Sequence, residues 1–218
     1  MIVLHTMKYR ESSLIIHGYT KESGRESMVL KGASRKGGLP LLHPLSIIEY
    51  SVSDSKYGSM KNIRDFSAGY RLDSIRGDIR KNIMAMFISE LLYRTVVLPE
   101  KDERLYGFIE DAVLKLENIS GNIANFHIWF TDRYISMIGF PMEKGFESFF
   151  NPFDDELAAL LSRVHGSGFD EAMRIPMTGK SRSGLISAML KYIEYHTGTR
   201  AELRSLPVLR SITEELCH

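Results

Sequence analysis

Short runs of alternating or clustered hydrophobic residues fill the first 70 positions, a pattern typical of β-strands. Leu14–Thr20 is apolar and rich in β-branched residues, Glu22-Ser23-Gly24 has turn chemistry, and Arg25–Leu30 alternates polar with apolar residues. These stretches predict a hairpin, and further strands are expected over 2–7, 45–52 and 60–70. Five short strands favour a small closed barrel, because closure leaves no exposed edge. The size fits an OB-fold, and an SH3-like barrel fits the pattern as well.

The hydrophobic period changes at Asp73. From there, apolar residues recur at intervals of three and four, which predicts α-helices. Helices are expected over 73–97, 102–119, 123–138, 154–164, 168–173, from 181 or 183 to 195, and 206–216. Long amphipathic helices with short links pack as an antiparallel bundle. The sequence therefore predicts an α+β protein of two domains: a five-stranded OB-fold barrel over 1–72 and an all-α helical domain over 73–218.

Composition narrows the class of protein. With 44% hydrophobic and 25% charged residues, the chain has the composition of an ordinary globular protein. No apolar run approaches the roughly 20 residues of a membrane span. The first residues also lack the basic start and cleavage site of a secretory signal. Because Cys217 is the single cysteine, an internal disulfide is impossible, which fits a reducing cytosol. We expect a cytoplasmic protein with no membrane partner.

The net charge of +1 hides an asymmetry along the chain. Residues 1–80 carry 13 Lys and Arg against 8 Asp and Glu, whereas residues 81–218 carry 15 against 19. The basic first part indicates a nucleic-acid face, and chance scatter of charge explains the asymmetry equally well.

A small basic loop follows the predicted hairpin. Lys31, Arg35 and Lys36 gather between Gly32 and Gly37-Gly38, and cations beside an accessible backbone suit a phosphate chain. Tyr9 and Tyr57, in loop-like surroundings, are the aromatic residues most suited to stacking on bases. The candidate DNA-binding residues are Lys31, Arg35, Lys36, Arg25, Lys8, Arg10, Arg76 and Arg80.

No catalytic constellation is found in the sequence. Residues 32–37 have the glycine spacing of a phosphate-binding loop, but Gly38-Leu39 follows where Lys-Ser or Lys-Thr is required. Gly179-Lys180-Ser181 has that ending, but Arg174 stands where the first glycine belongs. The seven histidines are scattered, and His5 and His17 are expected to be barrel residues. We expect no enzymatic activity, no cofactor and no metal.

Four groups of residues suggest a known family. They are 2–6 (IVLHT) with 12–15 (SSLI); 19–20 (YT) with 24–25 (GR) and 31–33 (KGA); 90–92 (ELL); and 195–196 (YH) with 203–209 (LRSLPVL). In this order and spacing, the chain resembles the bacterial DNA repair protein RecO family. The resemblance implies an OB-fold, a helical C-terminal domain and no enzymatic turnover. It also implies a recombination mediator that binds single- and double-stranded DNA and anneals complementary strands. Such proteins load recombinase together with RecR and the single-stranded DNA-binding protein.

The chain departs from this family in two places. Many relatives carry a four-cysteine zinc module after the bend at 139–141, whereas residues 142–153 here contain no cysteine. Zinc is therefore not expected, and Phe146, Phe149, Phe150 and Phe153 are expected to stabilise that segment by packing. The first strand also begins without a short lead-in, which a trimmed chain or a wrongly assigned start would explain.

The resemblance also implies a partner with an acidic, apolar C-terminal tail, which needs an apolar groove with a cation at its rim. The helical domain is expected to supply the groove from Leu91, Tyr106, Phe108 or Trp129, with Arg94, Arg104 or Arg133 nearby. The alternative is that these apolar residues are bundle core. Two other functions remain open: an OB-type RNA-binding module, and a protein-only adaptor whose basic loop docks an acidic partner.

Overall fold

The computed structural model describes residues 1–32, 39–53, 60–96, 100–141, 149, 155–200 and 202–215. The chain divides into two compact units. The first comprises Met1–Asp73 and Val96–Val113, and the second comprises Ser74–Thr95 and Leu114–His218. The chain thus leaves the first unit at Asp73 and later returns to it. The predicted division into functional domains at residues 72 and 73 stays a prediction.

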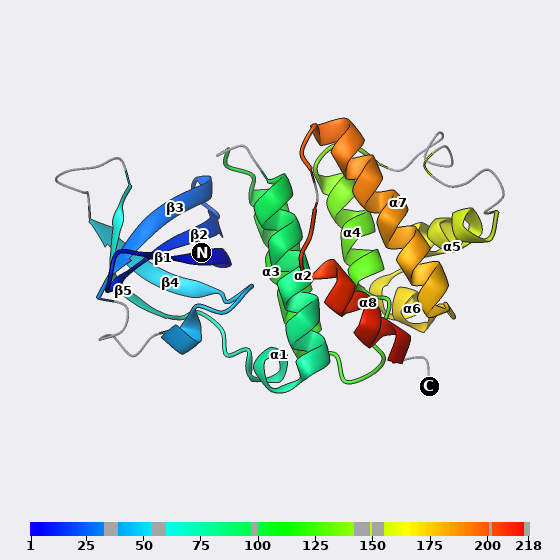
Figure 1. Ribbon diagram of the computed structural model, residues 1–218, viewed down its shortest axis with the longest axis horizontal. Coiled ribbons are helices and arrows are strands. Elements are labelled where there is room, and N and C mark those ends of the chain that lie inside the picture. The colour runs from blue at the N-terminus through cyan, green and yellow to red at the C-terminus, as the bar shows by residue number, and fades with distance from the viewer. Residues whose placement is uncertain are drawn as a thin grey trace. The chain divides into compact units, whose positions relative to one another are not determined.

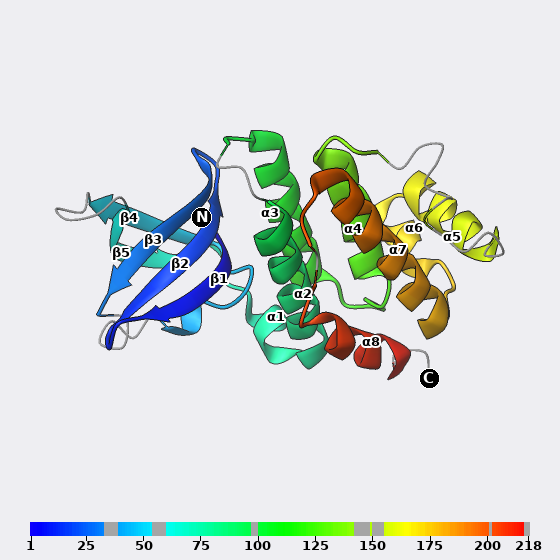
Figure 2. The same ribbon diagram turned by 45° about the horizontal axis from the view of Figure 1, so that its top comes forward.

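The first unit contains a five-stranded sheet in the order β1-β2-β3-β5-β4. Its strands are β1 (Ile2–Tyr9), β2 (Ser13–Thr20), β3 (Gly24–Lys31), β4 (Ile48–Ser53) and β5 (Asn62–Ala68). Strands β1, β2 and β3 form an antiparallel meander (Figure 2), β4 pairs antiparallel with β5, and β3 pairs parallel with β5. The predicted OB-like fold is confirmed.

The expected closure of the barrel is only partial among the described strands. A single antiparallel bridge between Ile2 and Ile47 joins β1 to the segment that leads into β4. The strand expected from residue 45 begins at Ile48, because buried Leu45 has a φ of 62° and turns the chain.

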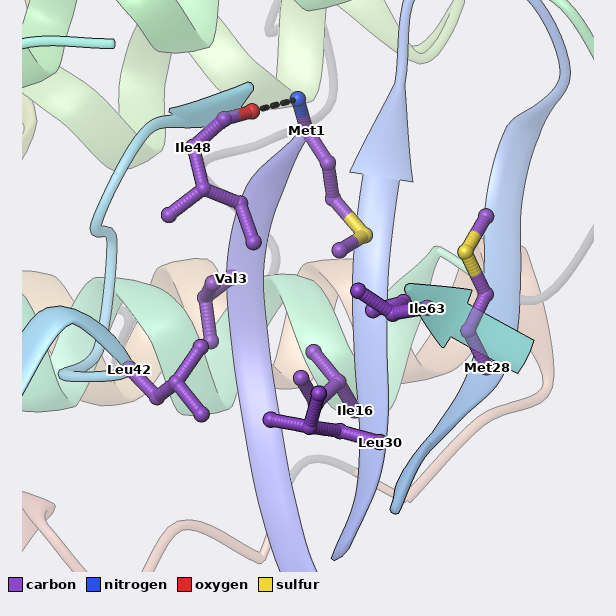
Figure 3. Packing of buried hydrophobic residues seen from close by; sticks show 8 residues of the cluster. All are labelled: Met1, Val3, Ile16, Met28, Leu30, Leu42, Ile48 and Ile63. Atoms are coloured by element: carbon purple, nitrogen blue, oxygen red, sulfur yellow. Dashed lines mark hydrogen bonds between the residues drawn. The ribbon is translucent and has the colours of Figure 1, made fainter. Parts of the chain in front are cut away.

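The core of the sheet follows from the alternation of its strands. Eight buried side chains form one cluster (Figure 3): Met1, Val3, Ile16, Met28, Leu30, Leu42, Ile48 and Ile63. The N-terminal ammonium donates a hydrogen bond to the Ile48 carbonyl oxygen at 2.8 Å. Gly18 leaves room for the Met1 side chain, because a Cβ there would lie 2.2 Å from the Met1 sulfur.

Helices make up the rest of the regular structure, after the short 3-10 helix η1 (Leu39–Leu41). They are α1 (Asp73–Gly77), α2 (Ile79–Thr95), α3 (Glu103–Asn118), α4 (Phe126–Met137), α5 (Asp155–Gly166), α6 (Phe169–Arg174), α7 (Gly179–Thr197) and α8 (Leu206–Glu215). In the second unit, α4 packs against α2, α5, α6 and α7, and α8 packs against α2 and α7. Figure 1 shows α4 beside α7. Helix α4 is buried around its whole circumference in its first two turns, as a central helix must be.

The expected single helix over 73–97 is broken into α1 and α2. The break falls at Asp78, whose carboxylate accepts a hydrogen bond from the backbone N–H of Arg80 at 2.8 Å and so caps α2. The carboxylate of Glu117 caps α1 by accepting from the N–H groups of Ser74 and Ile75. Both caps are acidic side chains. The spacing of hydrophobic residues along the sequence does not show which acidic residue will cap which helix.

Two other helix ends differ from expectation. Helix α7 begins at Gly179, before the expected serines, because the Thr178 hydroxyl accepts from the Ser181 N–H at 3.0 Å. Ser205, expected to cap α8, instead donates its hydroxyl to the Glu90 carboxylate at 2.7 Å.

In the expected phenylalanine-packed segment, Phe149 contacts the rings of Tyr192 and Tyr195, with centroids 5.1 and 5.5 Å away. Phe146, Phe150 and Phe153 lie outside the described residues.

Among the helices of the described ranges, none combines the length and apolar character needed to cross a bilayer.

Candidate nucleic-acid interface

The register of the sheet brings several candidate DNA-binding residues to one end of β1, β2 and β3. Tyr9 pairs with Ser13, and Ser13 pairs with Lys31, so these three residues form one row across the strands. Lys31 is exposed at the end of β3, and Lys8 is exposed one residue before Tyr9. The Arg10 guanidinium lies 5.2 Å from the centroid of the Tyr9 ring. This end of the sheet therefore combines three cations with an aromatic ring.

A wider surface extends from this row along the outer face of the meander. We call it the outer face, and it comprises His5, Met7, Tyr9, Ile15, His17 and Lys31. On β2 and β3 these residues alternate with the core residues. On β1 a shift in register between Val3 and His5 moves the residues from His5 onward to the face that points away from the cluster of Figure 3. His5 and His17 are cross-strand partners with stacked rings, 6.0 Å between centroids. A strip of rings and apolar side chains that ends in cations suits a single nucleic-acid strand.

Sequence reasoning treated these two histidines as barrel residues. The structure places both on the outer face, with His17 Nδ1 2.7 Å from the Ser27 hydroxyl. Burial lowers the pKa of His17, and the neighbouring charges of His5 and Arg25 act in the same direction. The period-two alternation of β2 was a signal that could have assigned His17 to this face. His5 reaches it through the register shift after Val3, which alternation alone does not predict.

The other candidate DNA-binding residues are not brought to this row. Arg25 lies six residues from Lys31 on β3, roughly 20 Å away along an extended strand, and donates to the Val96 carbonyl oxygen at 2.7 Å. Arg35 and Lys36 lie outside the described residues, as does Tyr57.

Arg76 and Arg80 belong to the second unit. Arg80 makes an ion pair with Asp78, with 2.6 Å between Nη2 and Oδ2. Hydrogen bonding from Arg80 lowers the pKa of the Asp78 carboxyl to about 2. The charge of Arg80 is thus largely balanced by Asp78, the residue just before α2, whereas Arg76 is half-buried in α1.

The candidate partner-binding residues are divided between the core and the surface. Trp129 is only 6% exposed and lies edge-on to Phe169, 4.8 Å between centroids. Arg133 donates to the carbonyl oxygens of His165 and Ser167, which fixes the turn between α5 and α6. Arg94 and Arg104 are exposed, whereas Leu91 and Tyr106 are buried and Phe108 is half-buried. Trp129 and Arg133 therefore serve the packing of the second unit.

A cavity of about 440 Å³ lies next to this core, at the C-terminal end of α3. Its walls are the loop 118–122 and helix α6, with Phe169 and Met173 as apolar lining and Lys115 and Arg174 as cations. The Lys115 ammonium lies 5.8 Å from the Phe169 ring centroid. This cavity has the apolar surface and cationic rim expected for the partner groove, although it uses other residues. The sequence did not reveal this cavity, because Lys115 and Arg174 are brought together only by tertiary packing.

Comparison with known proteins bears on the family resemblance. Residues 1–68 match the family model described as Recombination protein O N terminal. The proteins named DNA repair protein RecO in Porphyromonas gingivalis, Flavobacterium psychrophilum and Phocaeicola vulgatus are 25%, 26% and 28% identical to the chain. Each of these alignments covers 97% of this chain and 96% of the relative. These matches support the RecO family for this chain. The family resemblance expected from the sequence is thereby confirmed.

The chain bends at Gly139, where φ is 91°. Within the described ranges, no three His, Cys, Asp or Glu side chains come close enough together to hold a metal ion.

Proposed function

We propose that this member of the RecO family is a DNA repair and homologous recombination mediator. It binds single- and double-stranded DNA, anneals complementary strands and helps RecR to load recombinase on strands coated by the single-stranded DNA-binding protein. It acts in the cytoplasm and performs no catalysis. Family membership supports the repair role. The observation that carries the DNA-binding role is the row of Lys31 and Tyr9, with Arg10 over the Tyr9 ring.

The proposed mechanism is physical and has no chemical step. Cations of the basic loop and of the row neutralise phosphates and release counterions, so that two strands approach without strong repulsion. Rings of the outer face stack on bases, each contributing about 1–3 kcal/mol. Annealing then follows from the high local concentration of complementary strands. Lys31, Lys8, Arg10, Arg35 and Lys36 are the residues that we assign to this role, with Arg25, Arg76 and Arg80 as further candidates.

The decisive experiment measures annealing of two labelled complementary oligonucleotides across a salt series. Changing Lys31, Arg35 and Lys36 together to alanine should weaken annealing and lower the slope of log affinity against log salt by about 2 for single strands. A matched variant changes Lys180, Lys191 and Arg200, three exposed cations of the second unit, and should leave annealing intact. Equal losses in both variants would refute the assignment of the basic loop.

The same experiment separates the alternative functions. An RNA-binding module would bind a single-stranded RNA of the same sequence more tightly than the DNA. A protein-only adaptor would bind neither nucleic acid at low salt.

We further propose that the cavity beside Phe169 receives the acidic, apolar tail of the single-stranded DNA-binding protein. The cations Lys115 and Arg174 at its rim and the apolar surface of Phe169 and Met173 support this placement. Changing Arg174 to glutamate reverses the charge at an exposed position and should abolish binding of a labelled tail peptide. Retention of full affinity by Arg174→Glu would refute the placement and leave the DNA-binding role intact.

A further inference from the structure

A second, larger cavity of about 660 Å³ lies within the first unit and has the opposite electrostatic character. It is formed by the turn between β2 and β3, by β4, by the segment after β5 and by the first half of α3. None of the candidate DNA-binding or partner-binding cations lines it. Its size falls within the roughly 300–1,000 Å³ of cavities that bind ligands.

Carboxylates converge on this cavity from three separate elements. Glu22 comes from the turn, Glu49 from β4, and Glu103 and Glu110 from α3, whereas its lining cations are Lys21 and the Met1 ammonium. Glu103 is already paired with Lys101 at 2.6 Å, so Glu22, Glu49 and Glu110 are the carboxylates that carry the argument. The two glutamates of α3 are seven residues apart and therefore share one face of the helix. Such a convergence of like charges repels phosphate and favours a bound cation.

An ammonium group already occupies part of this environment. The Met1 nitrogen is hydrogen-bonded to the Ile48 carbonyl oxygen at 2.8 Å. Burial lowers the pKa of this ammonium, and the carboxylates of Glu22, Glu110 and Glu49 act in the opposite direction. Glutamates from all three elements therefore act on one point in the cavity and favour positive charge there, whereas burial has the larger effect at the Met1 nitrogen itself.

Three tyrosines give the cavity aromatic walls. Tyr50, Tyr70 and Tyr106 line it, and Tyr106 is held in place by stacking on Tyr19 with 6.5 Å between ring centroids. The Tyr106 hydroxyl donates to Glu110 at 3.4 Å. Tyr70 is 43% exposed, so part of the aromatic surface remains accessible. Aromatic faces beside carboxylates bind lysine and arginine side chains through cation–π attraction.

We propose that this cavity binds a basic peptide segment of a partner protein, with a lysine or arginine side chain held between the tyrosines and the carboxylates. The site goes beyond the proposed DNA-binding function, because its charge excludes nucleic acid. Peptide and DNA would therefore bind the same molecule at the same time.

Binding is tested by fluorescence anisotropy with a labelled peptide of alternating arginine and glycine. The variant Glu22→Gln/Glu49→Gln/Glu110→Gln should weaken binding about tenfold or more, and moderate salt should weaken binding to the unchanged protein. The matched control changes Glu156, Glu171 and Glu202 to glutamine, three exposed carboxylates of the second unit. Equal weakening in both triple variants would mean non-specific attraction and overturn the proposal.

A steric variant tests the cavity without altering its charge. Gly107 lines the cavity, and a Cβ at this position would meet no other atom within 4 Å. Gly107→Phe should block the peptide, whereas Gly107→Ala should leave its affinity unchanged. Full peptide binding by Gly107→Phe would overturn the proposal. Spermidine should compete only weakly, and equal affinity for spermidine and the peptide would show a polyamine site instead. Strand annealing is measured on the same variants and should not change, so a failure of either function is detected separately.

Discussion

The buried histidine of α4 should make the second unit sensitive to acid. His127 is 1% exposed, and its ring lies edge-on to Phe87 with 6.0 Å between centroids. Burial lowers the pKa of His127 to about 3, with a further contribution from the Arg182 charge, while a hydrogen bond with the backbone of Ala124 opposes both. In the unfolded chain the same imidazole titrates near pH 6.5.

The size of the effect follows from linkage. Between pH 6.5 and about 3, the unfolded state binds a proton that the folded state does not, so the free energy of unfolding falls as the pH falls. Each pH unit in this window costs about 1.36 kcal/mol. Lowering the pH from 7 to 5 should therefore remove about 2 kcal/mol of stability through His127 alone.

The assay is urea denaturation at pH 7 and pH 5, followed by tryptophan fluorescence. Trp129 is the single tryptophan, is buried and lies in the same helix, so its emission reports on this unit. The variant His127→Leu should lose the acid-sensitive contribution, so its stability relative to the unchanged protein should rise by about 2 kcal/mol between pH 7 and pH 5. His43→Gln, at an exposed histidine, is the control and should leave the pH dependence of the free energy of unfolding unchanged. If the free energy of unfolding of His127→Leu differs from that of the unchanged protein by the same amount at pH 7 and pH 5, the reasoning is refuted.

Two further substitutions, one in each unit, test the packing. Asn125→Ala removes two hydrogen bonds to backbone carbonyls and one from Arg182, all of them buried. The free energy of unfolding measured by urea denaturation should therefore fall by about 4 kcal/mol. A fall of less than about 1 kcal/mol would contradict this prediction. Gly24→Ala should destabilise the first unit strongly, because φ is +67° and the new Cβ would lie 2.1 Å from the Glu100 carbonyl oxygen. Gly32→Ala has the same φ but an open environment, so its melting temperature should fall less. Equal falls in the melting temperatures of Gly24→Ala and Gly32→Ala would refute the steric argument.

The structure places the candidate site residues in different surroundings. Lys31 was singled out because it begins a basic loop, and the structure places it at an exposed strand end. Arg25 was a candidate as one of the cations of the predicted barrel. An extended strand separates its position from that of Lys31, and its side chain donates to the Val96 carbonyl oxygen. Trp129 was a candidate for the apolar partner groove, with bundle core as the alternative, and its ring packs on Phe126 and Phe169.

The order of strands and helices is encoded locally, because a period of two or of 3.6 reflects which side chains of one segment face the core. The five strands and the helices that follow could therefore be predicted from the sequence, and so could the OB-like class. Strand register, helix caps and cavities depend on residues far apart in the chain. Glu22, Glu49 and Glu110 read as ordinary surface charges along the sequence, and only folding brings them around one cavity. The same holds for Lys115 and Arg174, whose shared cavity exists because α6 packs beside the end of α3.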